Sequence, residues 1–122
     1  MKPGQKGIVR IISAFKNSIR GIRDAFRFEA AFREETYFAT IAIPLGFYLA
    51  HNNIELILLV GSIILLMAVE ILNSAIEAVV DRVGAEYHEL SGRAKDMASA
   101  AVLFAIILVL LVWVSLLYPH YF

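Results

Sequence analysis

Five polar residues, three of them acidic, interrupt an otherwise apolar stretch in the middle of the chain. They are Glu70, Asn73, Ser74, Glu77 and Asp81. If this stretch is a helix, all five lie within about 60° of Glu70 around its axis, so they form one narrow polar stripe. An ionised side chain near the centre of a bilayer costs about 2.5 to 3.5 kcal/mol. The stripe is therefore expected to face a protein interior or a wet crevice rather than lipid.

Several kinds of chemistry would use such a stripe. Stacked carboxylates without a basic partner on the same helix favour a hard cation such as Mg²⁺ or Ca²⁺. A proton or ion pathway would use similar residues. The alternatives are hydrogen bonds that hold helices together, or solvation near the headgroups, which fits Asp81 beside Arg82. From these residues alone, an enzyme, a transporter and a structural protein all remain open.

Two further polar runs can approach the stripe from the same side. The first, residues 29–35, contains Glu29, which could supply another metal ligand or lie in a solvated charged turn. The second, residues 86–96, precedes the last apolar segment. Its Lys95 could hold a phosphate or extend toward the membrane interface. His88 taken singly is more often a surface histidine than a catalyst.

The sequence lacks the usual nucleotide-binding motifs. It contains no Gly-rich phosphate loop, no dinucleotide-binding fingerprint and no protein-kinase signature set. It also contains no cysteine, which excludes disulfides, zinc-thiolate sites, iron-sulfur clusters and cysteine nucleophiles. If the chain is a kinase, it belongs to another lineage.

The composition predicts a membrane protein. The chain of 122 residues is 60% hydrophobic, whereas a soluble domain is about 45 to 50% apolar. Over residues 8–27 apolar residues recur every three or four positions beside lysines and arginines, which predicts an amphipathic helix at about residues 7–28. Such a helix either lies in the headgroup plane or packs on a soluble core, and this chain offers no soluble core.

Three apolar segments follow, and each can span a bilayer. We expect an all-α, integral-membrane chain that forms one domain over residues 1–122, with spans at about residues 30–50, 54–82 and 91–118. The first span contains Pro44, so it is either kinked or extended back over the polar residues 32–35. Eight of the eleven Lys and Arg residues precede residue 34, and the other three lie between residues 82 and 95. The positive-inside rule therefore places the amino-terminal helix and the 82–95 loop in the cytoplasm.

The runs 70–81 and 86–97 closely resemble the signature of the prokaryotic integral-membrane diacylglycerol kinase family. The resemblance extends to residues 29–33 and to the plan of a surface helix plus three transmembrane helices, so it covers nearly the whole chain. It implies Mg²⁺-dependent transfer of the γ-phosphoryl group of ATP to diacylglycerol, giving phosphatidic acid at the cytoplasmic face of the bacterial inner membrane. It also implies a homotrimer with active sites shared between chains, and no nucleic-acid partner.

The resemblance implies roles for individual residues. Glu70 is expected to be the general base that takes the proton from the lipid hydroxyl, with Glu29 and Glu77 as metal ligands. The expected ATP contacts are Arg10, Asn17, Glu29, Asn73, Glu77, Glu86, Tyr87, His88, Lys95 and Asp96. The expected lipid contacts are Arg10, Ala14, Ser18, Arg23, Ala31, Glu35, Glu70, Ser99 and Trp113. Two residues depart from the family pattern: Asn17 replaces an aromatic residue, and Ala98 replaces the usual glycine.

Three other functions remain as alternatives. An undecaprenol kinase of the same superfamily would use the same fold with a polyprenyl alcohol as acceptor, although residues 86–96 look more like the diacylglycerol branch. A small cation transporter would use Glu70 and Glu77 as its pathway. A structural membrane protein would use the polar stripe only to specify oligomerisation. Metal-dependent ATP consumption that requires a lipid alcohol would separate the kinases from the other two.

Overall fold

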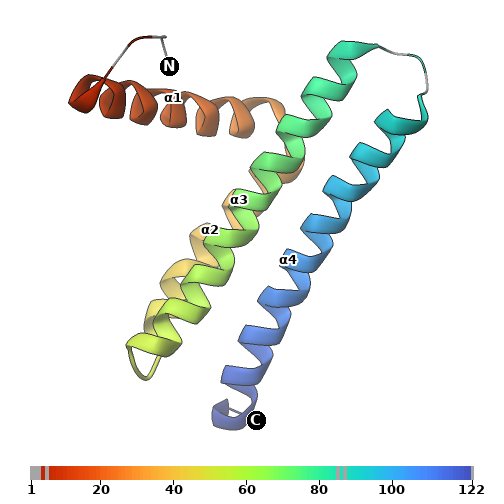
Figure 1. The fold of residues 1–122 in the computed structure, drawn as a ribbon. Coiled ribbons are helices and arrows are strands. Elements are labelled where there is room, and N and C mark those ends of the chain that lie inside the picture. Colours follow the sequence, from red (N-terminus) through yellow and green to blue (C-terminus); the bar gives the residue numbers. More distant parts are fainter. Residues whose placement is uncertain (1–3, 5, 85, 87, 122) are drawn as a thin grey trace.

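The described part of the chain folds into four helices. The computed structural model describes residues 4, 6–84, 86 and 88–121, and over these residues it contains no strand. The helices are α1 (Gly7–Phe28), α2 (Ala30–Leu49), α3 (Asn53–Val83) and α4 (Glu89–Tyr121). Helix α3 lies between α2 and α4, and α1 projects away from these three (Figure 1). The predicted all-helical class is confirmed.

Two of the helices are long and apolar enough to cross a membrane. The qualifying segments are Asn53–Val83 in α3 and Glu89–Pro119 in α4. Helix α2 has 20 residues. Its first turns carry charged residues, which leaves an apolar part of about 14 residues against the roughly 20 that a span needs. Helix α2 begins at Ala30, so it does extend back over the polar residues 32–35, and it continues through Pro44.

Small residues allow α2 to lie close to α3. The buried core consists of Ala39 and Ala42 of α2, Ile63 and Leu66 of α3, and Ala105 and Val109 of α4. At Gly46 an added Cβ would lie 3.2 Å from the Val60 side chain, closer than ordinary contact. Small residues at such contacts are typical of membrane helices, which associate through close van der Waals packing. The core is thin, since its largest fully buried side chains among the described residues are Phe32, Leu59 and Ile63.

A single extended residue, Glu29, separates α1 from α2. Its backbone angles of φ −114° and ψ 107° interrupt the helical path. The Arg33 guanidinium donates hydrogen bonds to the carbonyls of Phe26 at 2.9 Å and Arg27 at 3.2 Å. These carbonyls belong to the last turn of α1, where helical donors are missing. Arg33 therefore holds the two helices together at the bend, which we call the elbow (residues 26–33).

The apolar stripe of α1 is uncovered. Ile8 is 72% exposed and Phe15 is 66% exposed. Within Gly7–Phe28, all of which the structure describes, Ala25 is the one buried residue. The carboxy-terminal part of α1 therefore joins the bundle, and the rest of the helix leaves its apolar face uncovered.

Candidate functional site

On α3, the polar stripe lies on the same face as a buried apolar stripe and follows it along the helix. Leu59, Ile63 and Leu66 face the core, and Glu70 and Ser74 follow at the same helical spacing. Glu70 is 5% exposed and Ser74 is 7% exposed. The expectation that the stripe faces a protein interior is confirmed for these two residues.

Three further carboxylates lie near Glu70. Glu77 follows two turns along α3, Glu29 lies at the elbow and Glu35 lies in the second turn of α2, and each interacts electrostatically with Glu70. The Glu35 Oε2 atom is buried and has no hydrogen-bond partner among the described residues. The same holds for Oδ1 of Asn73, whose side chain reaches Glu70. Buried oxygens without donors are costly, so this cluster is suited to receive a cation or a hydroxyl group.

The cluster offers oxygen ligands to a divalent cation without forming a complete cage. Among the residues that the structure describes, no three His, Cys, Asp or Glu side chains are placed to hold a metal ion. Glu29 and Glu77 are both half-buried and both near Glu70. Mg²⁺ usually takes one or two carboxylates and completes its shell with water and substrate phosphates. The predicted pair fits that preference, and the unpartnered Asn73 oxygen lies in the same cluster.

An apolar groove between α1 and α3 leads to this cluster. Its volume is about 370 Å³. Its lining residues are Gly21, Asp24, Ala25, Phe28, Glu29, Ile71, Ser74, Ala75 and Ala78. Asp24, Glu29 and Ser74 provide polar groups in this otherwise largely apolar groove, which therefore suits a molecule with an apolar body and a polar end.

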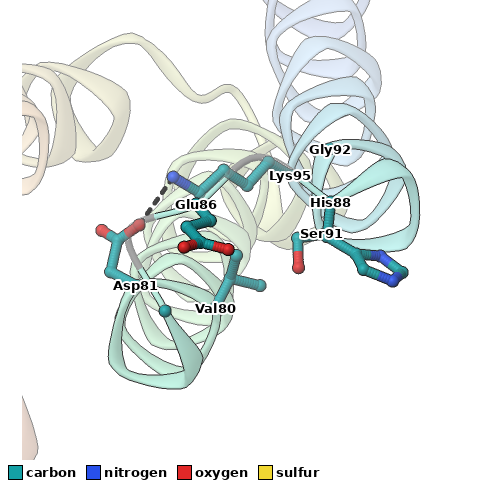
Figure 2. Close-up of a pocket in the computed structure, with 8 residues that line it drawn as sticks. Val80, Asp81, Glu86, His88, Ser91, Gly92 and Lys95 are labelled. Carbon is teal, nitrogen blue, oxygen red and sulfur yellow. Dashed lines mark ion pairs between the residues drawn. The ribbon is translucent and has the colours of Figure 1, made fainter.

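A second, polar hollow lies where α3 turns into α4. Its volume is about 420 Å³. The residues that line it, most of them labelled in Figure 2, are Val80, Asp81, Gly84, Glu86, His88, Ser91, Gly92 and Lys95. Lys95 Nζ lies 2.6 Å from Asp81 Oδ1, and Lys95 also interacts electrostatically with Glu77. Three predicted ATP contacts, Glu86, His88 and Lys95, thus line one hollow that adjoins the carboxylate cluster.

His88 caps the amino terminus of α4. Its Nδ1 accepts the N–H of Leu90 at 3.1 Å, and its carbonyl accepts the N–H of Gly92 at 2.9 Å. These contacts satisfy donors that begin a helix without partners. The ring points away from Lys95 (Figure 2), so Nε2 is the atom left for any nucleotide contact. Tyr87, the neighbouring predicted contact, lies outside the described residues.

Part of the predicted site lies far from Glu70 within one chain. Arg10 precedes Ala25 by fifteen residues, which is about 22 Å along a helix, and Ala14 and Asn17 lie between them. Ser18 donates its hydroxyl to the Ala14 carbonyl at 2.9 Å. This part of α1 points away from α3 and α4 (Figure 1). A single chain therefore does not bring these residues to its own carboxylate cluster.

The other predicted lipid and ATP contacts are spread along the chain. Arg23 is exposed just before the elbow and Ala31 is exposed within it. Asp96 and Ser99 are exposed on α4. Trp113 lies about 21 Å further along α4 than Ser99. The Trp113 Nε1 atom donates to the Leu59 carbonyl at 3.1 Å. Its ring helps to line an apolar hollow of about 230 Å³ near the carboxy terminus.

The structure adds two residues to the site. Asp81, expected only to be solvated beside Arg82, pairs with Lys95. Arg33 holds the elbow that carries Glu29. The sequence does hint that Asp81 can meet residues of the next helix. Two antiparallel helices joined by a short turn bring together the residues near that turn. No comparable pattern identifies Arg33.

The family model for prokaryotic diacylglycerol kinase matches residues 16–117 of the chain. The chain belongs to this family. Its similarity to proteins named diacylglycerol kinase extends over nearly its whole length. It is 54% identical to the Escherichia coli K12 kinase over 115 residues, which cover 94% of each chain. It is 50% identical to the Haemophilus influenzae kinase over 112 residues, covering 92% of this chain and 95% of the relative.

A more distant member of this kinase family, from Pseudomonas aeruginosa, is 44% identical over 114 residues, which cover 93% of each chain. The resemblance noted from the polar runs of the sequence is therefore confirmed. The region that matches the family contains the elbow, the carboxylate cluster and the polar hollow, whereas Arg10 and Ala14 precede it.

Proposed function

We propose that the chain transfers the γ-phosphoryl group of ATP to the primary hydroxyl of diacylglycerol, giving phosphatidic acid and ADP. Family membership supports the reaction and the acceptor. The structural observation that carries the proposal is the burial of Glu70 in an α3 stripe where Glu29 and Glu77 converge. An apolar groove meets this cluster from one side and a polar hollow adjoins it on another. This arrangement suits a reaction between a lipid and a water-soluble donor.

Glu70 is the proposed general base. As the lipid hydroxyl oxygen bonds to the γ-phosphorus, its proton passes to the Glu70 carboxylate. The bond from the γ-phosphorus to the bridging oxygen breaks, and ADP leaves. A carboxylate positioned within hydrogen-bond reach of a hydroxyl contributes about 10²- to 10⁴-fold to such a rate. The low exposure of Glu70 also limits the access of water that would compete with the lipid.

Glu29 and Glu77 are the proposed ligands of Mg²⁺, together with phosphate oxygens of ATP. When bound, the ion supplies positive charge that neutralises the phosphates. Lys95 adds a positive charge beside Glu77, and Asn73 presents its side chain to the same cluster. Positioning and charge neutralisation account for most of the catalysis in phosphoryl transfer. Glu29, Asn73, Glu77 and Lys95 would together supply the positioning and, with the bound ion, the charge neutralisation.

The membrane arrangement is part of the proposal. We place α2, α3 and α4 across the bacterial inner membrane, with α1 and the 82–95 loop on the cytoplasmic side. Helices α3 and α4 have the length and composition of spans, and α2 runs beside α3 (Figure 1). The uncovered apolar stripe of α1, flanked by basic residues, suits the headgroup plane. ATP would then reach the polar hollow from the side that carries the basic residues.

A homotrimer with shared sites completes the proposal. Arg10, Ala14 and Asn17 lie far along α1 from Glu70 of the same chain. In the proposed trimer, these residues would therefore contribute to the site around Glu70 of a neighbouring chain. Helix α4 also exposes large apolar side chains, including Phe104 at 73%. Lipid or a second chain would cover this face.

The decisive experiment measures acceptor use by the purified protein in mixed micelles. With labelled ATP and Mg²⁺, we expect label in phosphatidic acid when diacylglycerol is present and little transfer to undecaprenol. Exclusive phosphorylation of the polyprenol would show that the acceptor is wrong. Ion flux across vesicles without ATP turnover would instead support a cation transporter.

A further inference from the structure

The Asp81–Lys95 ion pair bridges the polar hollow. The carboxylate lies in the last turns of α3 and the ammonium group lies in the second turn of α4, with 2.6 Å between Oδ1 and Nζ. Figure 2 shows the Lys95 side chain extended across the hollow toward Asp81. The Asp81 side chain is 66% exposed and the Lys95 side chain is 43% exposed. A pair this exposed contributes little to the stability of a fold.

The pair does restrict where the Lys95 ammonium lies. A lysine side chain has four flexible carbons, and without a partner its charge would sample a wide volume. The ammonium group has three donors. When one donor is taken by Asp81, the other two remain available to a ligand in the hollow, and Glu77 lies close enough to interact with the same charge. Asp81 thus holds Lys95 between the hollow and the carboxylate cluster.

We infer that Asp81 is a positioning residue that holds Lys95 in place for the phosphates of the nucleotide. The inference rests on the proposed function, because it takes ATP as the ligand of this hollow. Asp81 acts through Lys95, since a carboxylate placed directly on a phosphate would repel it. Protein kinases, which have another fold, likewise hold their phosphate-binding lysine with a carboxylate from a neighbouring helix.

The test compares steady-state kinetics of Asp81→Asn and Asp81→Glu with the wild type in mixed micelles. Asparagine keeps the shape of the side chain and removes its charge. We expect Asp81→Asn to raise the KM for MgATP about three- to tenfold with kcat changed less than about twofold, because the loss lies in ground-state binding. Asp81→Glu restores the charge and should recover part of the lost affinity.

A double-mutant cycle shows whether Asp81 works through Lys95. Lys95→Met alone should raise the KM for MgATP, and adding Asp81→Asn to Lys95→Met should raise it no further. The matched control is Glu89→Gln, which breaks the exposed Glu89–Arg93 pair of 3.8 Å at the same end of α4. Glu89 does not line the hollow, and its substitution should leave the KM unchanged.

The outcomes separate this inference from the proposed function. An unchanged KM in Lys95→Met would contradict the nucleotide site itself. A raised KM in Lys95→Met combined with an unchanged or lowered KM in Asp81→Asn overturns only the positioning role. A fall in kcat and thermal stability without a change in KM would also overturn it, because it would assign Asp81 a purely structural role.

Discussion

Glu70 lies in the contact between α2 and α3 with the carboxylates of Glu29, Glu35 and Glu77 as neighbours. Negative charges this close together repel one another strongly in a partly dry site. A divalent cation relieves that repulsion, as does transfer of a proton to one of the carboxylates. At the residue scale, this crowding supports the proposed binding of Mg²⁺ and the proposed transfer of the lipid hydroxyl proton to Glu70.

The first prediction concerns Glu70→Gln. The amide keeps the size of the side chain but cannot accept the hydroxyl proton, so we expect turnover to fall about 10²-fold or more. Binding of MgATP, measured by calorimetry in detergent, should stay within about threefold of the wild type. Glu34→Gln, an exposed neighbour on α2, serves as the control with normal turnover. Near-normal turnover of Glu70→Gln in lipid would remove Glu70 from the role of base.

The second prediction concerns Glu77→Gln. Loss of one carboxylate ligand should raise the KM for MgATP about tenfold, and a higher Mg²⁺ concentration should recover part of the loss. Rates measured over a matrix of ATP and Mg²⁺ concentrations test this. A fall in kcat with unchanged dependence on Mg²⁺ would mean that Glu77 is not a metal ligand.

At the scale of elements, the elbow is the feature that depends most on tertiary contacts. Residues 22–43 contain neither glycine nor proline, so no helix-breaking residue requires a bend at Glu29. The bend is held by side chains from its two sides. Arg33 donates to two α1 carbonyls, and the Phe26 ring packs edge-to-face against Tyr37 with centroids 5.9 Å apart.

The third prediction concerns Arg33. Hydrogen bonds from a charged donor contribute about 1.5 to 3 kcal/mol each, so Arg33→Met should lower thermal stability and misplace Glu29. We expect its kcat to fall about tenfold, with Arg33→Lys intermediate because lysine keeps the positive charge but carries it on a flexible stem without the planar guanidinium. Arg82→Met, an exposed arginine at the end of α3, is the control. Unfolding in detergent and turnover are measured together, and wild-type values for both in Arg33→Met would refute the role of Arg33 in holding the elbow.

The fourth prediction tests the contact between α2 and α3. Gly46→Leu places a side chain against Val60 and Leu59, where even a Cβ would lie 3.2 Å from Val60. Overpacking of this kind costs about 1 to 3 kcal/mol. Gly61→Leu is the matched control, since no atom lies within 4 Å of a Cβ built there. Equal stability of the two variants against denaturation in micelles would show that α2 does not approach α3 so closely.

At the scale of the whole molecule, the four described helices separate residues that the family resemblance groups in one site. Arg10 lies about 22 Å along α1 from the point where that helix joins the bundle. The thin core and the uncovered faces of α1 and α4 are also typical of a subunit. The proposed trimer explains both observations.

The fifth prediction follows from shared sites. Glu70→Gln and Arg10→Ala are each expected to be nearly inactive. Oligomers reconstituted from a mixture of the two should regain about a tenth or more of wild-type turnover, because some sites then combine intact residues from different chains. Absence of any recovery, with mixing verified by two affinity tags, would argue that each chain forms its own complete site.

The parts of the structure that the sequence predicts are those that depend on local pattern. The helical class follows from hydrophobic periodicity, and the burial of Glu70 and Ser74 follows from the cost of exposing polar groups to lipid. The short turn between α3 and α4 indicates that residues near their adjoining ends meet, but the pairing of Asp81 with Lys95 in particular depends on the register of the two helices. The capping contact of His88 depends likewise on where α4 begins, which periodicity alone does not determine.

The elbow also has a mechanical consequence. Helix α1 is about 33 Å long and is joined to the bundle through one non-helical residue, Glu29. Any rotation of α1 relative to the bundle is therefore centred near Glu29, which is one of the two proposed Mg²⁺ ligands. If α1 lies in the headgroup plane as proposed, a bilayer that tilts it would have to change the backbone torsions of Glu29 or strain the Arg33 hydrogen bonds across the elbow. In the proposed arrangement, the shape of the membrane would thus influence the direction of the Glu29 carboxylate.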